Sequence, residues 1–358
     1  MSIRHESAHL HVSGRALYAD DMPLPANALH GAFGLSTIAH GRIRSMDTAA
    51  VLAAAGVVAV VTASDIPGEN NYGSILHDDP IFAAGMVQYV GAPLFAVAAT
   101  SHAAARKAAV RARIDYEPLP AILDIRAALA AQSMVVPTER LERGRPQEVL
   151  ARSPFRLRGT VQMGGQDHFY LEGQIAIAIP QEDGGMLLIS STQHPSEIQQ
   201  IVAHALARSA NQVVVQCRRM GGGFGGKETQ PALIAAAAAI MAHKTGRPVK
   251  LRLDRDTDML MTGKRHDFLA DYEVGFDATG RILGLTVLLA ARCGYSADLS
   301  GPVNDRAMLH IDNAYFLENV SIVSYRCKTH TVSNTAFRGF GGPQGMVVIE
   351  QIIDSIAE

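Results

Sequence analysis

The feature that most constrains this chain is a glycine-rich loop between a strand pattern and a helix pattern. The stretch NQVVVQCRR (211–219) is typical of a strand, MGGGFGGKE (220–228) has five glycines in six positions, and PALIAAAAAIMAHKTG (231–246) is a long apolar helix pattern. Glycine lets a backbone pass very close to a ligand, and the start of a helix offers free N–H groups to an anion. We therefore expect a ligand-binding loop here rather than a flexible turn.

This loop also satisfies the GxxxxGK pattern of a nucleotide-binding loop, through Gly221, Gly226 and Lys227. In that motif a Ser or Thr follows the lysine and binds magnesium. Here the next residue is Glu228, and its carboxylate would repel a phosphate. A phosphate-binding loop of an NTPase is therefore the weaker alternative.

The loop has a counterpart near the end of the chain. Residues 334–344 (NTAFRGFGGPQ) form a second glycine-rich turn that holds an arginine between two phenylalanines, ahead of a helix pattern. Residues 189–195 (ISSTQHP) place a small polar cluster between a strand pattern and a helix pattern, where ordinary helix capping is an equally good explanation. One such turn is a weak signal, but two turns of this type at helix starts favour a binding site.

Two shorter motifs carry further titratable groups. DRAMLH (305–310) contains Asp305 and Arg306, and we expect Asp305 to be a local structural partner. His168, in HFYLE, fits a partly buried and hydrogen-bonded histidine better than a ligand. The sequence has no HExxH motif and no His/Cys cluster, so a metal that acts here would arrive inside an organic cofactor.

Composition excludes several classes of function. With 48% apolar and 18% charged residues among 358, the chain is typical of a folded protein and not of a disordered one. A net charge of -2 gives no general attraction to nucleic acid or to an anionic membrane. Three widely separated cysteines cannot hold an iron–sulfur cluster, and the longest apolar run is too short to cross a bilayer. The N-terminus lacks the apolar core of a signal peptide. We expect a cytoplasmic protein without nucleic-acid or membrane partners.

The chain is expected to form an α+β fold in two parts. Strand patterns at 29–36, 57–62 and 93–99 alternate with helix patterns, so we expect the first ~120 residues to fold independently. The charged stretch 138–154 is broken by proline and glycine and predicts a surface connection. At the end, residues 345–358 form an amphipathic helix pattern, and we expect its apolar face to be exposed to water.

Taken together, the motifs resemble the molybdenum-binding subunit of the xanthine dehydrogenase and aldehyde oxidase family. The matching segments, in the family's order, are GGQDHFYLE (164–172), STQ (191–193), MGGGFGGKE (220–228), DRAMLH (305–310) and NTAFRGFGGPQG (334–345). HVSGRALYADD, DIPG, VGAPLFAVAA and YEPLPAI are similar to the α/β hammerhead domain of that family. The resemblance implies a hammerhead domain at 1–125, a connecting segment at 126–153, and the first, incomplete part of a molybdopterin-binding domain at 154–358.

The resemblance also implies a molybdenum–molybdopterin cofactor. It places Gln193, Phe224 and Arg338 in the environment of the molybdenum. It places Gly223 and Gly225 with these three residues among the cofactor-binding positions. Backbone N–H groups in the glycine-rich loops would suit the oxygens and the phosphate of the pterin.

For the substrate, the resemblance implies a purine held by Glu228, Arg306 and Phe340. A carboxylate on one edge, a guanidinium on another and a phenyl ring on the face would orient a flat heterocycle that has donors and acceptors. The related aldehyde oxidases typically lack this carboxylate and this arginine. Their presence here points to a purine.

The implied function is hydroxylation of a purine, xanthine or hypoxanthine, by a xanthine dehydrogenase-type oxidoreductase complex. The resemblance places the catalytic glutamate base outside this chain, in the second half of the molybdenum subunit. It places the 2Fe–2S clusters and FAD on a partner subunit or domain. The expected partners are therefore that second half, an iron–sulfur/FAD subunit and the purine. The alternative is a split or truncated chain that has no independent activity and serves only in assembly.

Overall fold

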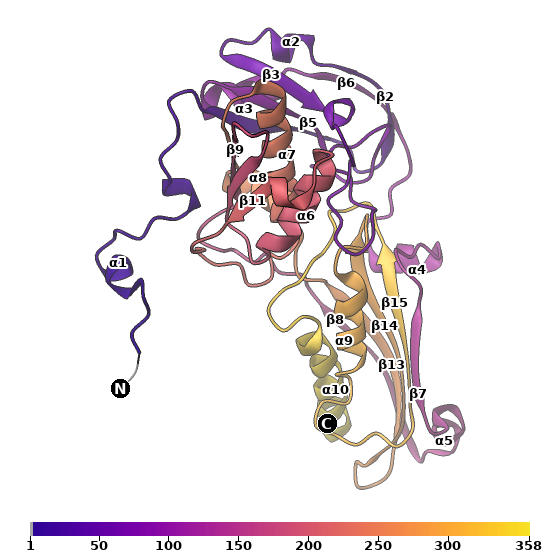
Figure 1. Cartoon of the computed structure of the whole chain (residues 1–358). Helices are drawn as coiled ribbons and strands as arrows, with labels where there is room; N and C mark the ends of the chain where they lie inside the picture. The colour runs from indigo at the N-terminus through magenta and orange to yellow at the C-terminus, as the bar shows by residue number, and fades with distance from the viewer. Residues whose placement is uncertain (1–2) are drawn as a thin grey trace.

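The structure, a computed structural model, describes residues 3–358. The chain has an upper part and a lower part, each containing a large β-sheet covered by helices (Figure 1). An N-terminal arm with the short helix α1 (Ala8–Val12) extends away from both parts. The expected α+β fold is confirmed.

The upper part contains a seven-stranded mixed sheet with the strand order β11-β10-β9-β12-β1-β5-β3. Its strands are β1 (Leu29–Leu35), β3 (Val57–Thr62), β5 (Pro93–Ala99), β9 (Ile175–Pro180), β10 (Met186–Ser190), β11 (Val213–Gln216) and β12 (Val249–Arg252). β3 and β5 span the residues that the sequence predicted. β1 pairs in parallel with β12 and antiparallel with β5, so strands from the two predicted domains share one sheet.

The core of the upper part is built around α7 (Pro231–Thr245), the apolar helix after the glycine-rich loop. Its residues from Pro231 to Ala242 are all buried, because α7 packs against β9, β12 and β3 and against α6 (Pro195–Ala205). The helix ends at Gly246, whose φ of 64° gives a left-handed cap that glycine adopts without strain. Even so, among residues 3–358 no helix is both long enough and apolar enough to cross a bilayer.

A smaller three-stranded sheet, β4-β2-β6, lies beside the large sheet within the predicted first domain. Its strands and the helices near them are β2 (Gly41–Asp47), β4 (Met86–Val87), β6 (Arg113–Pro118), α2 (Ala49–Leu52) and α3 (His102–Ala109). Ser101 caps the start of α3, because its hydroxyl accepts a hydrogen bond from the Ala104 N–H at 3.2 Å.

The lower part contains a five-stranded sheet with the order β7-β15-β14-β13-β8. Its strands and helices are β7 (Glu139–Arg143), β8 (Phe155–Met163), β13 (Phe268–Phe276), β14 (Ile282–Gly294), β15 (Val320–Lys328), α4 (Ile125–Ala130), α5 (Pro146–Arg152), α9 (Ser300–Met308) and α10 (Gly342–Ala357). Alternate residues of β13 face opposite sides: Phe268 and Ala270 join the core under α9 and α10, and Leu269 joins the core under α4. One more helix, α8 (Arg255–Met261), follows β12 and supports the site described below.

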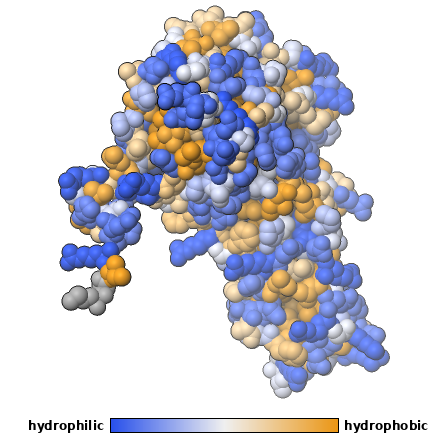
Figure 2. Space-filling model, in the orientation of Figure 1, coloured by the Kyte–Doolittle hydropathy of each residue, from blue (hydrophilic) through white to orange (hydrophobic). Residues whose placement is uncertain are grey.

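The final helix corrects one expectation. Val348, Ile349 and Ile352 of α10 are fully buried, because α10 packs against β8, β13 and α9. The expected exposure of its apolar face is therefore wrong, since the lower sheet supplies a partner for this face. Figure 2 shows hydrophilic residues over much of the visible face, with hydrophobic areas on both the upper and the lower part. Phe316 and Val347 remain exposed near this helix.

The predicted connecting segment, 126–153, takes part in the lower fold. It contains β7, which pairs antiparallel with β15 from Glu139↔Ser324 to Arg143↔Val320. The charged residues of β7 fit an edge strand whose side chains meet water. The domain division at residues 125 and 153 stays a prediction, but this pairing and the shared upper sheet argue against independent folding of the first part.

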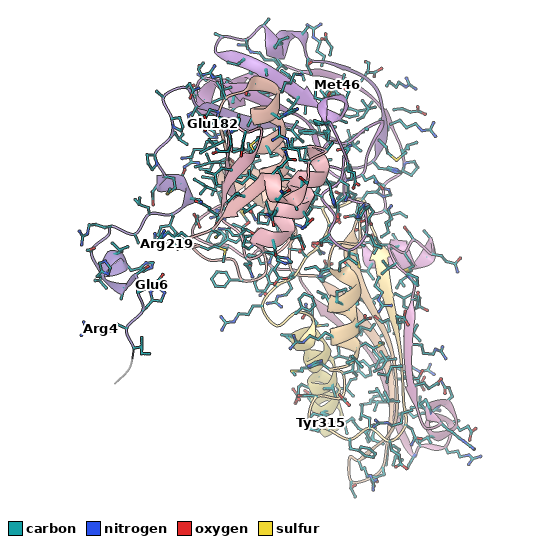
Figure 3. All side chains as sticks on the ribbon, in the orientation of Figure 1. Arg4, Glu6, Met46, Glu182, Arg219 and Tyr315 are labelled. Carbon is teal, nitrogen blue, oxygen red and sulfur yellow. The ribbon has the colours of Figure 1, made fainter. Side chains whose placement is uncertain are left out.

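Arg219 attaches the N-terminal arm to the body of the protein. Its guanidinium donates a hydrogen bond to the Leu17 carbonyl at 2.8 Å and another to the Ser7 hydroxyl at 3.3 Å (Figure 3). The arm is therefore tied to the segment that precedes the glycine-rich loop.

We expect residues 1–125, produced alone, to lack a cooperative unfolding transition. Removing β12 would leave β1 with an unpaired edge, and removing α7 would expose the buried face of Leu29 and Phe33 to water. Circular dichroism melts and size-exclusion chromatography of this fragment and of the full chain test the expectation. A cooperative melt from a monomeric fragment would show that the first part folds by itself.

Candidate functional site

The candidate site lies at the carboxyl ends of two neighbouring parallel strands. β10 leads through residues 191–194 into α6, and β11 leads through the first glycine-rich loop into α7. Because β10 and β11 run in parallel, both connections emerge at the same edge of the upper sheet. This edge is where α/β sheets commonly bind ligands.

The first loop approaches its neighbours so closely that side chains would not fit. A Cβ atom at Gly223 would lie 2.5 Å from Gln193 Oε1, and one at Gly225 would lie 2.6 Å from the Ala336 carbonyl. Gly225 has a φ of 102°, and Phe224 also has a positive φ, 57°, which is strained for a residue with a side chain. Phe224 nevertheless remains half exposed. The loop therefore presents this residue to the outside while its glycines pack within.

Gln193 is held by the backbone of the first loop. Its Oε1 accepts hydrogen bonds from the N–H groups of Gly225 at 2.9 Å and Lys227 at 3.2 Å, and its own N–H donates to the Lys227 carbonyl at 2.7 Å. Since the side-chain oxygen is occupied by the loop, the exposed side chain has its NH₂ group left to donate to a ligand.

The second loop joins the first through backbone contacts. The Arg338 N–H donates to the Phe224 carbonyl at 2.8 Å. Thus the structure brings together all five predicted cofactor residues: Gln193, Gly223, Phe224, Gly225 and Arg338. The Arg338 side chain is exposed, and within residues 3–358 it forms no ion pair.

His168 supports both loops from the interior. It is 7% exposed, its Nε2 lies 2.7 Å from the Ala336 carbonyl, and its ring stacks on Phe337 with centroids 4.6 Å apart. On the other side of this arrangement, the Arg265 guanidinium lies 3.8 Å from the centre of the Phe337 ring. Burial lowers the pKa of His168, although the Ala336 carbonyl opposes this shift. The interpretation of His168 as a hydrogen-bonded, buried histidine is confirmed.

Arg306 and Phe340, two of the predicted substrate residues, lie close together. The turn at Phe340 has a φ of 50° and packs on α9, which carries Arg306. A Cβ atom at Gly341 would lie 2.0 Å from the Val303 carbonyl, and one at Gly342 would lie 3.6 Å from Arg306 Nε. The turn can therefore pack this closely on α9 only because residue 341 is a glycine.

Glu228, the third predicted substrate residue, lies at the end of the first loop, near His194 and Glu197. His194 Nδ1 and Glu197 Oε2 are 2.9 Å apart, and both residues line a cavity of about 340 Å³. Burial raises the pKa of Glu228, and the nearby His194 lowers it in part. In the described chain, no hydrogen bond or ion pair occupies the side chain of Glu228 or of Arg306. Both charged groups therefore remain available to a ligand.

Lys227 decides against the nucleotide-binding alternative. Its side chain is fully buried, and its ammonium group donates to the Glu172 carbonyl at 2.7 Å and to the Ser191 hydroxyl at 2.8 Å. It also lies 3.5 Å from Glu172 Oε2 and 4.6 Å from the centre of the Tyr170 ring. Burial lowers the pKa of Lys227 to about 8. A lysine used in this way cannot reach a phosphate outside the loop, so the P-loop hypothesis is wrong.

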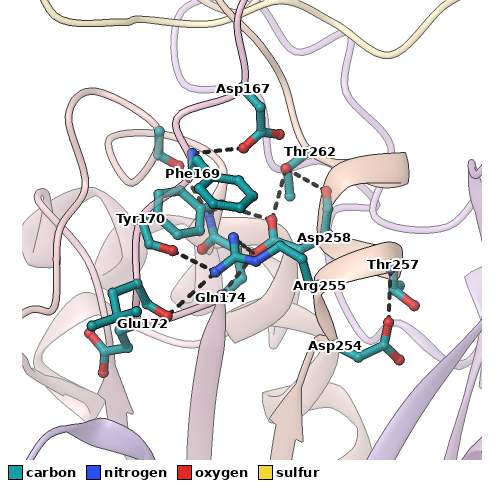
Figure 4. A network of polar contacts seen from close by, with 12 residues as sticks. Asp167, Phe169, Tyr170, Glu172, Gln174, Asp254, Arg255, Thr257, Asp258 and Thr262 are labelled. Carbon is teal, nitrogen blue, oxygen red and sulfur yellow. Dashed lines mark hydrogen bonds and ion pairs between the residues drawn. The ribbon is translucent and has the colours of Figure 1, made fainter.

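A buried polar network supports this loop from behind (Figure 4). Tyr170 donates to Asp258 Oδ1 at 2.7 Å, and Gln174 Nε2 donates to the Tyr170 hydroxyl and to the Gly226 carbonyl, both at 2.9 Å. Arg255 donates to the Tyr170 carbonyl at 2.5 Å. Sequence reasoning noted the HFYLE motif but missed its partners, because Gln174, Arg255 and Asp258 carry no local signal that points to the loop.

Asp305 has the structural role expected from the sequence. Its carboxylate accepts a hydrogen bond from Arg326, which is 1% exposed and also donates to the Pro137 carbonyl at 2.8 Å. Asp305 is thus occupied within the lower part, and the adjacent Arg306 is free to face the site.

The donor set fits an organic cofactor that carries oxygens and a phosphate. Among residues 3–358 there is no group of three or more His, Cys, Asp or Glu side chains that could hold a metal ion. The site offers instead the amide of Gln193 and an exposed guanidinium at Arg338, both held on loops whose glycines Gly223 and Gly225 pack tightly against Gln193 and Ala336. These are groups that recognise an extended anionic ligand rather than a bare ion.

Comparisons with known proteins agree with this class of site. Residues 130–358 match the family model of the molybdopterin cofactor-binding domain, and residues 13–120 match that of the aldehyde oxidase and xanthine dehydrogenase a/b hammerhead domain. The chain therefore belongs to the molybdopterin cofactor-binding domain family, and the resemblance seen in its motifs is confirmed.

The similar proteins include xanthine dehydrogenases. The chain is 46% identical to xanthine dehydrogenase 1 of Arabidopsis thaliana and 44% identical to a xanthine dehydrogenase/oxidase of Gallus gallus, in each case over 99% of this chain and 26% of the relative. An aldehyde oxidoreductase from Desulfovibrio gigas has a similar structure, with a TM-score of 0.90 and 26% identity over 98% of this chain and 41% of that one. The chain thus spans about a quarter of the length of the two xanthine dehydrogenases.

We expect Gly225→Ala to destabilise the protein by about 1–3 kcal/mol, because alanine is strained at a φ of 102° and its Cβ would meet the Ala336 carbonyl. Gly164→Ala is the matched control, since a Cβ atom there has open space and Gly164 has no positive φ. Urea unfolding of both variants measures the difference. Equal effects of the two substitutions would contradict the close approach described for the first loop.

Proposed function

We propose that this chain forms part of a molybdenum hydroxylase that acts on a purine, xanthine or hypoxanthine. The observation that carries the proposal is the pair of unoccupied charged side chains, Glu228 and Arg306, beside the two glycine-rich loops. The relatives named xanthine dehydrogenase support the same class of reaction. In this proposal, the chain supplies part of the cofactor site and part of the substrate site.

Five residues would hold the cofactor. The Gln193 NH₂ group would donate a hydrogen bond toward the metal's ligands, and Gly223 and Gly225 would let the backbone of Phe224 approach the group. Arg338 would place a positive charge against the cofactor's negative groups. When bound, the molybdenum–pterin group supplies oxygen-transfer and two-electron redox chemistry.

Three residues would bind and orient the purine. Arg306 would bind a ring oxygen and stabilise the negative charge that develops on it during attack at a ring carbon. Phe340 would stack on the face of the ring. Glu228 would bind the opposite edge, and burial raises the pKa of its carboxyl while the nearby His194 lowers it in part.

The remaining parts of the reaction are assigned outside these residues. We place the catalytic glutamate base in the second half of the molybdenum subunit, and the 2Fe–2S clusters and FAD on a partner subunit or domain. Support comes from the relatives, of whose length this chain covers 26%. The alternative, an assembly piece without activity of its own, makes a different prediction for metal content.

Metal analysis separates these two proposals. We expect close to one molybdenum per complex when the chain is purified with the co-expressed proteins encoded next to it, and none in the chain purified alone. The physical reason is that, in this proposal, residues outside this chain complete the cofactor site. Absence of molybdenum from both preparations would contradict the proposed function and favour the assembly role.

Substrate specificity provides a second prediction. In the complete enzyme, Glu228→Ala and Arg306→Met should reduce kcat/KM for a purine by about 30-fold to several thousand-fold, the equivalent of about 2–5 kcal/mol, with smaller losses for an aldehyde. An aldehyde has no ring edges to lose. The exposed residues Glu182 and Arg113 provide the matched controls Glu182→Ala and Arg113→Met. Equal losses for both substrates would assign Glu228 and Arg306 to the cofactor or the fold.

A further inference from the structure

A buried carboxyl lies where the elements of the candidate site meet. Asp298 is in the turn between β14 and α9, has a φ of 39° and is 7% exposed. Its Oδ2 accepts a hydrogen bond from Gln230 Nε2 at 3.3 Å, and Gln230 Oε1 accepts one from the Gly263 N–H at 2.7 Å. The hydroxyls of Thr229 and Thr335, 3.2 Å apart, also face this carboxyl.

These partners belong to the three elements that carry the proposed substrate residues. Thr229 directly follows Glu228, at the end of the first glycine-rich loop. Thr335 begins the second loop, which leads to Phe340. Asp298 itself precedes α9, the helix of Arg306. One carboxyl therefore connects both loops with α9.

A second buried carboxyl holds the same turn from the first part of the chain. Asp79, which is 2% exposed, forms a hydrogen bond with the Ser296 hydroxyl. Next to it, Asp78 Oδ2 accepts a hydrogen bond from the Ala297 N–H at 2.8 Å. The turn 295–299 is thus fixed by aspartates of the first part on one side and by the two loops on the other.

In the part of the chain that the structure describes, no cationic side chain pairs with these two carboxyls. Within residues 3–358, no Lys, Arg or His forms an ion pair with Asp79 or Asp298. The titratable groups that face them are acids or tyrosines: Asp78, Glu197, Tyr72, Tyr89 and Tyr295. A buried carboxylate without a cation is costly, so such a group keeps its proton.

We propose that Asp298 is a positioning residue that carries a proton and, in this neutral form, sets the two glycine-rich loops and α9 relative to one another, while Asp79 holds the same turn from the first part. The consequence for substrate binding rests on the proposed function, but the link itself does not. A neutral carboxyl can accept from Gln230 Nε2 and also donate to one of the threonine hydroxyls, which can act as acceptors as well as donors.

The link should weaken as the pH rises. Burial is the largest cause that raises the pKa of Asp298, to about 8, and of Asp79, to about 7. In the unfolded chain the pKa of an aspartate is about 3.9. Between that pH and the raised pKa values of Asp79 and Asp298, the folded protein therefore binds more protons than the unfolded chain. Their contribution to stability is complete below the unfolded pKa and is lost as the pH rises through about 7 to 8.

Hydrogen–deuterium exchange of the full chain tests the proposal. Asp298→Asn is the conservative variant and Asp298→Ala is the disruptive one. The control is Asp115→Asn, at an exposed site in β6. At pH 6 we expect Asp298→Ala to increase exchange about threefold to tenfold in peptides covering 220–230, 295–306 and 334–341 together. Asp298→Asn, which resembles the neutral acid, should leave these peptides protected. At pH 9, after correction for intrinsic exchange rates, wild type and Asp115→Asn should lose protection in the same peptides and Asp298→Asn should not.

Infrared spectroscopy provides a second measurement that does not depend on the alanine variant folding. At neutral pH we expect the carbonyl band of a protonated carboxylic acid in the wild type and a weaker band in Asp298→Asn. The proposal is overturned if wild type and Asp298→Asn show the same band, or if Asn and Ala variants raise exchange equally. Neither measurement requires cofactor or turnover, so failure here leaves the proposed function standing, and failure of the metal analysis leaves this link standing.

Discussion

The candidate site depends on the close approach between the backbone of the first glycine-rich loop and its two neighbours. On one side, the N–H groups of Gly225 and Lys227 both donate to Gln193 Oε1. On the other, Gly225 lies so near the Ala336 carbonyl that a methyl group would overlap it. The loop is therefore fixed between the start of α6 and the second loop. The backbone of the loop orients the side chain of Gln193 and exposes Phe224. Only glycine at positions 223 and 225 permits this close packing.

The upper sheet and its helices fix the geometry of this close approach. Both connections start from neighbouring parallel strands and end in helices that pack on the same sheet, so neither loop end can move without moving the core. The sheet continues through β12 into β1 and β5 of the first part. Functional groups placed on loops between rigid elements are held with more precision than the loops alone would allow. The first part therefore contributes to the site indirectly, by completing the sheet and by fixing the turn at Asp298.

Local patterns in the sequence predicted the elements well but not their long-range partners. β3 and β5 follow from apolar runs, and α7 begins at Pro231 and ends at Gly246. All of these signals act over a few residues. The β1–β12 pairing joins residues more than two hundred positions apart, and no local pattern encodes it. Local patterns also do not encode the partner of α10. The amphipathic pattern predicts the helix, but it does not predict the sheet that covers its apolar face. In the site, motifs located the two loops, whereas Asp298 and Gln174 were missed because their roles arise only from contacts across the fold.

The adjacent residues Lys227 and Glu228 show how one loop separates support from recognition. Lys227 points into the protein, where Glu172 and Ser191 satisfy its ammonium group, and Glu228 is left without a hydrogen bond or ion pair within residues 3–358. A pair of opposite charges next to each other in sequence could have neutralised one another at the surface. Instead Lys227 holds the loop from inside, and the carboxylate of Glu228 stays available to a ligand. A half-buried carboxyl with a raised pKa and no partner is costly to maintain unless a ligand completes it. The GKE sequence, which superficially suggests a phosphate loop, is thereby explained as a lysine that supports the loop from inside and a glutamate that stays unpaired outside it.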